Sequence, residues 1–403
     1  MRILFVAMSH SIHTCRWVNQ ITDQGWDVHL FPVDVAEIHP GFKNVTVHEL
    51  LYQRPPGLSS STRVKGLKWP LPKGIKVGYY ALETLQKSCT QIDRTHRLAN
   101  IIRRLKPDIV QSLEIQHAGY LTLEARNLLA GNFPTWIVTN WGSDIYLFGR
   151  LQAHADKIRE VLESCDYYSC ECQRDVQLAK QMGLKGEVLP VLTNTGGFDL
   201  TRVVQFRQSG PTSARRLILL KGYQHWAGRA LVGLRAIALC ARELQGYRVA
   251  VYLANNDVKI AAELASQSTG IPIEVIPYCS HDDMLRLYGR ARVSIGLSIS
   301  DAISTSLLEA MVMGAFPIQS CTACADEWIV DGESGFIVPP EDPELIAAAI
   351  LRAVSDDALV DHAAELNAQV SRERLDQNII RPQVIAMYEK IAAQGAVKRG
   401  QVK

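Results

Sequence analysis

The sequence lacks any long hydrophobic run. None of its apolar stretches approaches the ~20 residues that a membrane-spanning helix needs. The first of them, in MRILFVAM, is also too short for the hydrophobic part of a secretory signal peptide, and only one basic residue accompanies it. This run predicts a buried β-strand instead. These absences argue against an integral membrane protein and favour a location in the cytoplasm.

Groups of metal-binding residues are also scarce. The chain has nine cysteines, and this odd number is typical of reduced thiols in a cytoplasmic protein rather than of a disulfide framework. Two close pairs occur, Cys170 with Cys172 and Cys321 with Cys324. Neither pair is accompanied by a second Cys or His pair at the spacing of a zinc site, so we expect no metal centre.

Motifs of several common protein classes are missing as well. No G-x-G-x-x-G motif follows the first strand, which argues against a dinucleotide oxidoreductase. The absence of G-x-x-x-x-G-K-[ST] excludes a P-loop phosphotransferase, and the absence of G-x-S-x-G makes a serine hydrolase a poor candidate. The formal net charge is only +2 and no nucleic-acid-binding module is recognisable, so we expect no nucleic-acid partner.

The sequence does contain a regular alternation of apolar strands and helices. Hydrophobic residues make up 47% of the chain and charged residues 21%, as in ordinary globular proteins, and its 403 residues suffice for two to three domains. In the first half, strands are predicted at residues 2–8, 27–33, 107–113 and 134–141, and helices at residues 13–25 and 119–131. Apolar strands joined by helices are typical of a parallel sheet.

The second half repeats this pattern after a polar linker at about residues 200–213. Strands are predicted at residues 217–223, 247–253, 273–278, 292–298 and 315–320. Helices are predicted at residues 228–244, 281–291, 343–354, 358–370 and 381–393. We therefore predict an α/β protein with two Rossmann-like domains, residues 1–199 and 200–403.

The alternation stops between Gln53 and Tyr80. This stretch is rich in Pro, Gly and Ser and has six basic residues and no acidic one. It predicts a long loop or a small irregular subdomain. Its basic part, from Arg54 to Lys76 with Trp69, could lie on anionic lipid headgroups or near a lipid-linked acceptor. A solvated loop is the alternative interpretation.

The stretch SISDAISTSLLEAMVMGAFPIQS, residues 298–320, contains the strongest candidate site. It begins at the end of a predicted strand, and such carboxyl ends are where open α/β sheets bind ligands. Ser304, Thr305 and Ser306 predict the start of a helix, whose free backbone N–H groups attract an anion such as phosphate. Asp301 lies just before this helix and Glu309 about one turn into it. The pair could accept hydrogen bonds from ligand hydroxyls, or it could simply cap and stabilise the helix.

Here the sequence resembles a known family. The spacing of Asp301 and Glu309, the run AMVMGAFPIQS after them, and the segment DEWIVDGESGFIVPPEDPELIAAAI are similar to the signature of the group 1 (family 4) GT-B glycosyltransferases. In the first half, NTGGFD (residues 194–199) resembles the family's segment between its domains. The resemblance implies two Rossmann-like domains with parallel sheets that face each other across a cleft. It also implies that the last helix, about residues 380–395, packs back on the N-terminal domain.

The family resemblance also implies roles for individual residues. Glu309 would bind the donor ribose, Asp301 the hydroxyls of the donor sugar, and the amides near Ser304 and Thr305 the diphosphate. The family usually has Glu where this chain has Asp301, and Gly where it has Ser304, which leaves the sugar open. The family places an Arg and a Lys in the turn after residues 217–223, and Lys221 and Arg229 lie one position away from these places. They would neutralise the leaving diphosphate, with solvated surface cations as the alternative.

The N-terminal half has weaker candidates. The turn Gly142-Ser143-Asp144 resembles the HGSD turn of the family, with Trp141 in place of its His. Trp141 could stack on a sugar or belong to the core, and Asp144 could accept a hydrogen bond from the acceptor or cap a helix. Other side chains expected near the cleft are His10, His13, Arg16 and His117. A structural role is the alternative for each of the histidines.

Together these features predict a glycosyltransferase that moves a sugar from a nucleotide-diphosphate donor to a hydroxyl group. UDP or GDP is the expected nucleotide, and the family likeness implies retention at the anomeric carbon and no metal or other cofactor. A glycan, a lipid-linked molecule or a small molecule would be the acceptor, in the cytoplasm or at the inner face of the membrane. The alternatives are a nucleotide-sugar 2-epimerase with the same fold and a non-catalytic protein that binds nucleotide sugars.

Overall fold

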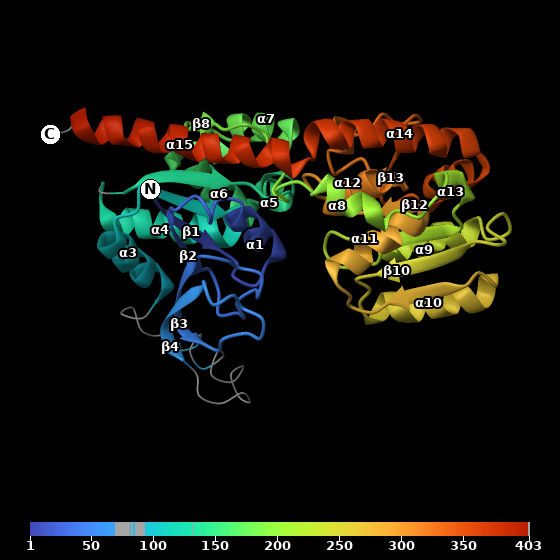
Figure 1. The fold of residues 1–403 in the computed structure, drawn as a ribbon, viewed down its shortest axis with the longest axis horizontal. Helices are drawn as coiled ribbons and strands as arrows, with labels where there is room; N and C mark the ends of the chain where they lie inside the picture. Colours follow the sequence, from blue (N-terminus) through green and yellow to red (C-terminus); the bar gives the residue numbers. More distant parts are fainter. Residues whose placement is uncertain (69–80, 82–83, 85–92, 132, 402–403) are drawn as a thin grey trace. The chain divides into compact units, whose positions relative to one another are not determined.

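The computed structural model of the protein describes residues 1–68, 81, 84, 93–131 and 133–401. The chain forms two compact units. Unit 1 consists of Met1–Gly196 and Arg381–Lys403, and unit 2 of Gly197–Ile380. Each unit contains a parallel sheet with helices packed against it, so the predicted α/β class is confirmed (Figure 1).

The sheet of unit 1 has eight strands in the order β4-β3-β2-β1-β5-β6-β7-β8. The apolar strand β1 lies near its centre and pairs in parallel with β2 on one side and β5 on the other. Because the strand order reverses between β1 and β5, their carboxyl ends form the topological switch point of this sheet. The strands are β1 (Arg2–Ala7), β2 (Asp27–Pro32), β3 (Thr46–Tyr52), β4 (Arg63–Lys68), β5 (Ile109–Leu113), β6 (Thr135–Thr139), β7 (Tyr167–Ser169) and β8 (Glu187–Val188).

The helices of unit 1 begin where the local sequence offers caps. The Ser11 hydroxyl accepts hydrogen bonds from the amides of His13 and Thr14, and Asp93 caps a later helix in the same way. The first helix ends at Asn19, six residues before the predicted end at Gly25. The helical segments are α1 (Ile12–Asn19), α3 (Arg94–Leu105), the π-helical turn η1 (Ile115–Gly119), α4 (Tyr120–Leu129), α5 (Ser143–Tyr146), η2 (Phe148–Arg150), α6 (Gln152–Ser164), α7 (Gln173–Gln181) and α15 (Gln377–Gln401).

The prediction of a loop or irregular subdomain after Gln53 is wrong for part of that stretch. Strand β4 lies in it and pairs in parallel with β3, although most of its side chains are exposed. An edge strand with charged side chains shows no apolar periodicity, so the sequence pattern could not reveal it. Of the basic stretch from Arg54 to Lys76, for which contact with lipid headgroups and a solvated loop were the alternatives, Trp69 and Lys76 lie outside the described residues. Arg54 donates hydrogen bonds to the carbonyls of its own loop, including Ser59 at 2.7 Å.

Helix α15 connects unit 2 to unit 1 and is anchored in unit 1 from Arg381 onward. The Tyr388 hydroxyl accepts a hydrogen bond from Trp17 Nε1 at 3.0 Å and donates one to Gln111 Oε1. Arg381 binds the backbone carbonyl of Gln20 at 2.9 Å. Tyr388 is completely buried, so the helix contributes to the core of unit 1.

The sheet of unit 2 has six parallel strands in the order β11-β10-β9-β12-β13-β14. Here β9 and β12 lie side by side in the centre, and their carboxyl ends form a second switch point. A single apolar core around this sheet includes buried side chains of β9, β12 and β13. The strands are β9 (Leu217–Lys221), β10 (Arg248–Tyr252), β11 (Ile273–Ile276), β12 (Ala291–Gly296), β13 (Phe316–Ser320) and β14 (Phe336–Val338).

Side-chain caps also start most of the helices of unit 2. Asn255, Ser280, Asp342 and Asp356 each accept a hydrogen bond from a backbone amide of the first turn that follows. The helical segments are α8 (Leu200–Val203), η3 (Val204–Phe206), η4 (Thr212–Ala214), α9 (Ala230–Leu239), α10 (Asn256–Thr269), α11 (His281–Arg290), α12 (Thr305–Met313), η5 (Ala325–Glu327), α13 (Pro343–Ser355) and α14 (Asp357–Arg374).

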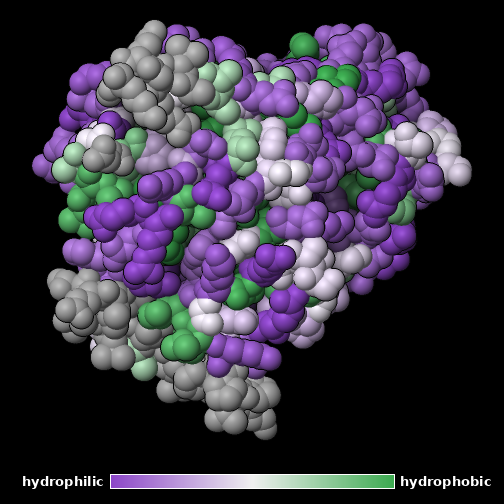
Figure 2. All heavy atoms as spheres, turned by 60° about the vertical axis from the view of Figure 1, so that its left-hand side comes forward, coloured by the Kyte–Doolittle hydropathy of each residue, from purple (hydrophilic) through white to green (hydrophobic). Residues whose placement is uncertain are grey.

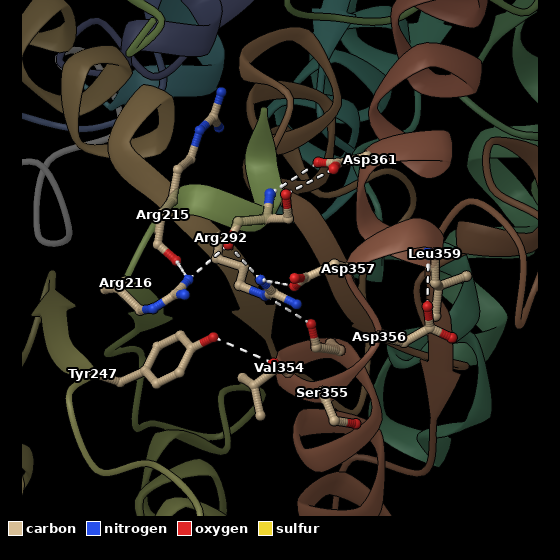
Figure 3. A network of polar contacts seen from close by, with 12 residues as sticks. Arg215, Arg216, Tyr247, Arg292, Val354, Ser355, Asp356, Asp357, Leu359 and Asp361 are labelled. Atoms are coloured by element: carbon tan, nitrogen blue, oxygen red, sulfur yellow. Dashed lines mark hydrogen bonds and ion pairs between the residues drawn. The ribbon is translucent and has the colours of Figure 1, made fainter. Parts of the chain in front are cut away.

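Two buried arginines link the elements at the amino edge of this sheet. Arg292 is fully buried and donates hydrogen bonds to the carbonyls of Ala353 and Ser213, and it forms an ion pair with Asp357 (Figure 3). Arg215 donates to the carbonyls of Met313 and Gly314 at 3.2 Å, at the end of α12. Because these carbonyls have no partner within their helix, the guanidinium completes their hydrogen bonding. Arg215 thereby fixes the far end of the helix that carries Glu309.

No helix of the described chain is both long and apolar enough to cross a membrane. On the face of the molecule drawn in Figure 2, hydrophilic residues predominate and hydrophobic residues form separate patches. No disulfide joins the cysteines in the part of the chain that the structure describes.

Candidate active site

The loops after β9 and β12 meet at the switch point of unit 2. The amide of Arg229 donates to the carbonyl of Leu297 at 3.1 Å, and that of Ile299 donates to the carbonyl of Ala227 at 2.9 Å. Gly228 allows the tight turn within the loop after β9, because a Cβ atom there would lie 2.3 Å from the carbonyl oxygen of Tyr223 in the same loop. The two loops are therefore fastened together by backbone hydrogen bonds.

Lys221 lies at the amino-terminal end of α12. Its Nζ is 3.3 Å from the hydroxyl of Ser304, which also bonds the hydroxyl of Ser306 at 2.6 Å. The side chain of Ser304, the N-cap residue of α12, makes no capping hydrogen bond to the first turn of the helix. A cation and an uncapped helix N-terminus therefore lie together, and both favour an anion. The structure brings together Lys221, Ser304, Thr305 and Ser306 from the predicted set.

Glu309 lies on the same helix and is 7% exposed. Its Oε1 is 2.7 Å from Nε2 of His281, the first residue of α11. The buried hydroxyls of Tyr252 and Tyr288, 2.6 Å apart, lie near it, and burial raises the pKa of both tyrosines above their usual value. The carboxylate is thus held in a polar, largely enclosed position with a defined orientation.

Asp301 lies in the loop between β12 and α12 and is half-buried. Its amide donates to the carbonyl of Thr322 at 3.4 Å, and its Oδ1 accepts from the amide of Ala302 at 3.0 Å. Tyr223 lies close enough for Asp301 to add to the effect of burial, which raises the pKa of the tyrosine. Asp301 is therefore at the same switch point as Lys221.

Arg229 has contacts that its sequence position did not indicate. Its Nε forms an ion pair with Glu341 at 2.8 Å, and its Nη1 lies 3.0–3.4 Å from four carbonyl oxygens of residues 225–228. This guanidinium organises the loop after β9. Its expected role in neutralising a diphosphate stays a prediction.

In unit 1, Glu114 occupies the end of β5 at the switch point. Its φ of 79° is unusual for a residue other than glycine, and such strained positions concentrate at functional sites. Its carboxylate accepts hydrogen bonds from the amides of His117 and Ala118 and lies 2.9 Å from Nδ1 of His117. The hydrogen bond to Glu114 raises the pKa of His117, whose imidazole is 68% exposed.

Asp144 lies deeper, between the loops after β5 and β6. Its Oδ2 accepts hydrogen bonds from the amides of Ile115 at 3.0 Å and Trp141 at 2.8 Å. Burial, and then the nearby Glu114, raise the pKa of Asp144 well above its usual range. These bonds hold the two loops together. A catalytic role for Asp144 stays a prediction.

The remaining candidates lie around the same edge of the sheet. The ring of His13 is in edge-to-face contact with that of Trp141, with centroids 6.1 Å apart. His10 lies 3.8 Å from a carboxylate oxygen of Asp34. Arg16 is half-buried on α1. The loops after β1, β5 and β6 thus bring His13, Trp141, Asp144 and His117 to one edge of unit 1.

Sequence reasoning missed the residues that support this site. His281 begins a helix that was predicted, but a histidine 28 positions from Glu309 gives no sign that the two side chains meet. The same holds for Tyr252, Tyr288 and Glu341. Knowing that β9 and β12 are neighbouring strands would have helped to predict which loops meet. The residues that follow neighbouring parallel strands come close together.

Comparisons with known proteins match both halves of the chain. The family model described as "Glycosyl transferases group 1" matches residues 245–372, and the one described as "Glycosyl transferase 4-like" matches residues 2–69 and 73–167. Together they cover most of the chain. A sequence search of curated proteins found no match.

Solved structures share the fold over nearly the full length. Sucrose-phosphate synthase from Thermosynechococcus elongatus has a TM-score of 0.67 at 15% identity and covers 98% of this chain and 100% of its own. Trehalose 6-phosphate synthase from Burkholderia multivorans has a TM-score of 0.69 at 12% identity, with coverage of 99% and 98%. HepE from Anabaena, solved with UDP-glucose, has a TM-score of 0.67 at 12% identity, with coverage of 97% and 100%. With glycosyltransferase family models on both halves, the chain belongs to the group 1 glycosyltransferases of GT-B fold.

Proposed function

We propose that the protein transfers a sugar from a nucleoside-diphosphate sugar to a hydroxyl group, with the donor bound at the switch point of unit 2. The observation that carries the proposal is the position of Lys221 at the uncapped start of α12, with Glu309 one turn further along the same helix. A diphosphate requires positive charge and N–H donors, and a ribose diol requires an oriented acceptor. This switch point offers all three kinds of group.

The leaving group determines which residue matters most for the chemistry. Breaking the bond between sugar and phosphate builds negative charge on the nucleoside diphosphate. Lys221 can stabilise that charge from a fixed position, together with the amides of Thr305 and Ser306. Asp301 would accept hydrogen bonds from the sugar, and Arg229 would act through the loop that it holds.

The donor nucleotide is proposed from related structures. HepE was solved with UDP-glucose, and trehalose-6-phosphate synthase of E. coli with UDP-2-fluoroglucose. UDP is therefore the first nucleotide to test, with GDP second. Retention of the anomeric configuration and independence from a metal are proposed from the family resemblance. A glycan, a lipid-linked molecule or a small molecule would be the acceptor.

Binding of UDP to site variants tests the donor site. We expect Glu309→Gln to weaken UDP binding by about 10- to 100-fold, since charge-assisted hydrogen bonds contribute about 1.5–3 kcal/mol. The amide can still accept the bond from His281, so the fold should persist.

Lys221→Met should lower kcat by about 10²- to 10³-fold. Isothermal titration calorimetry measures the affinity for UDP, and a donor-consumption assay measures kcat.

Matched controls are available on the exposed face of α10. Glu263→Gln and Lys259→Met remove the same charges far along the chain from the switch-point loops and should change neither value. Wild-type UDP affinity of Glu309→Gln together with a wild-type kcat of Lys221→Met would contradict the proposed donor site. Donor turnover without any acceptor would instead indicate an epimerase, and binding without turnover a non-catalytic protein. Product NMR and added EDTA check retention and metal independence.

A further inference from the structure

Unit 1 contains an open trough of about 730 Å³ that shares no residue with the candidate active site. Its size is in the range of small-molecule sites. Its lining residues come from Tyr167 of β7, from the edge strand β8 and the residues after it, from α7 and from α15. Strand β8 and helices α7 and α15 are labelled in Figure 1. All of its lining residues belong to unit 1.

The trough has an apolar floor and regular helical walls. Residues 188–191, at and after the end of β8, form the floor. The wall from α15 consists of side chains at helical spacing, Gln383, Ala386, Met387, Lys390 and Ile391. The wall from α7 contributes Gln173, Val176 and Lys180. Residues at positions i, i+3, i+4 and i+7 share one helix face, so both helices turn a continuous side toward the trough.

The charges of the trough are concentrated at one end. Lys390 forms an ion pair at 2.9 Å with Glu187, the first residue of β8, so this lysine is neutralised. Lys180 lies in the last turn of α7, which leads into the same end of β8. No acidic side chain of a described residue pairs with it. The uncharged Gln173 and Gln383 lie about two helical turns away, so the trough has one net positive charge at one end and a neutral opposite end.

We propose that this trough binds a medium-chain carboxylate amphiphile, with the alkyl chain along the apolar floor and the carboxylate at Lys180. A single unneutralised cation matches a single negative charge. A doubly charged phosphate or a nucleotide would leave charge unpaired. The walls span about seven residues of helix, or ~10 Å, which suits a medium-length chain lying along them. Met387 gives the α15 wall an adaptable side chain.

Titration of the full-length protein with decanoate, below its micelle concentration, tests the proposal. We expect saturable binding of decanoate, and weaker binding of decylammonium, which has the same chain and the opposite charge. Ala386→Phe should abolish binding, because Ala386 is exposed and a phenyl ring there would fill the trough. Lys180→Gln should weaken binding by up to about fivefold, the effect of one exposed ion pair.

The controls separate binding from folding. Lys185→Gln removes a nearby lysine that pairs with Glu163 outside the trough, and it should bind decanoate like the wild type. Urea unfolding of all variants checks that the fold persists. Equal binding of decanoate and decylammonium, or full binding by Ala386→Phe, would overturn the proposal. So would a wild-type dimer that Ala386→Phe converts to a monomer, since a second copy of the chain would then cover the trough.

Discussion

Glu49 is a buried carboxyl group on β3 whose pKa is raised from 4.5 to about 7. Burial is the main cause, and Asp34 adds to it, whereas Arg94 and Arg97 act in the opposite direction. Its Oε1 accepts from the amide of Leu50 at 2.9 Å, but no residue that the structure describes forms a hydrogen bond with its Oε2. Because folding favours the neutral form, deprotonation of this group opposes the folded state as the pH rises.

We expect Glu49→Gln to be more stable than the wild type above pH 7. The raised pKa contributes stability that is fully present below pH 4.5 and is lost as the pH rises through about 7. The glutamine does not titrate, so its free energy of unfolding should exceed that of the wild type by up to ~3 kcal/mol at pH 8. Urea denaturation at pH 5 and pH 8 measures the difference. The exposed Glu37→Gln is the control, and an advantage that grows toward low pH would contradict this assignment.

At the scale of residues, the sequence indicated which side chains belong to the site, but it did not indicate the side chains to which they bind. Asp301, Ser304 and Glu309 were found because their spacing marks a helix start after a strand. His281 was not found, because its bond to Glu309 depends on how α11 packs beside α12. Arg229 was expected to face a ligand, yet its guanidinium binds the carbonyls of its own loop.

At the scale of elements, cationic side chains lie at both ends of α12. Lys221 lies at its start, and Arg207 and Arg215 bind carbonyls at its end, with Arg207 Nε 2.8 Å from the carbonyl of Val312. A cation near a helix C-terminus is favourable, and these guanidiniums also satisfy carbonyls that the helix leaves unpaired. The helix that carries Glu309 is therefore positioned from the opposite edge of the sheet.

We expect Arg215→Met to reduce the free energy of unfolding by about 2–3 kcal/mol. The change leaves the carbonyls of Ala291, Met313 and Gly314 without this donor, and hydrogen bonds to charged groups contribute about this much. Urea denaturation of the whole protein measures the effect. The neighbouring Arg216 is exposed, so Arg216→Met should cost less than about 1 kcal/mol. Equal losses in the two variants would show that burial of Arg215 is not the cause.

At the scale of the whole molecule, unit 1 is built from two separate parts of the chain. The chain leaves it at Gly196 and returns at Arg381. Both points lie beside Gln20, since Gly196 packs against its side chain and Arg381 binds its carbonyl. The returning helix supplies the buried side chains Val384, Met387, Tyr388 and Ile391. Unit 1 without this helix would expose the surface on which they pack.

We expect residues 1–196 alone to unfold at much lower urea concentration than residues 1–196 joined to 381–403 by a short glycine-serine linker. Each large apolar side chain contributes about 1.5–3 kcal/mol when buried, so four of them approach the whole stability of a domain. A short linker suffices because both ends lie at Gln20. In the joined protein, Tyr388→Phe should cost about 1–3 kcal/mol, because Trp17 and Gln111 lose their shared partner. Equal unfolding midpoints for the truncated and joined forms would contradict this prediction.

The sequence by itself determined the local features of this protein. Apolar periodicity marked the central strands and most helices of both units, and residue spacing marked the start of α12. These features depend mainly on residues that are neighbours in the chain. Only the tertiary structure decided which strands lie side by side and which distant side chains come into contact. Strands β9 and β12 lie side by side although 83 residues separate Lys221 from Ser304, and Trp17 meets Tyr388 across 371 residues. Contacts over such distances arise from the packing of whole elements around a core, and no local pattern records them.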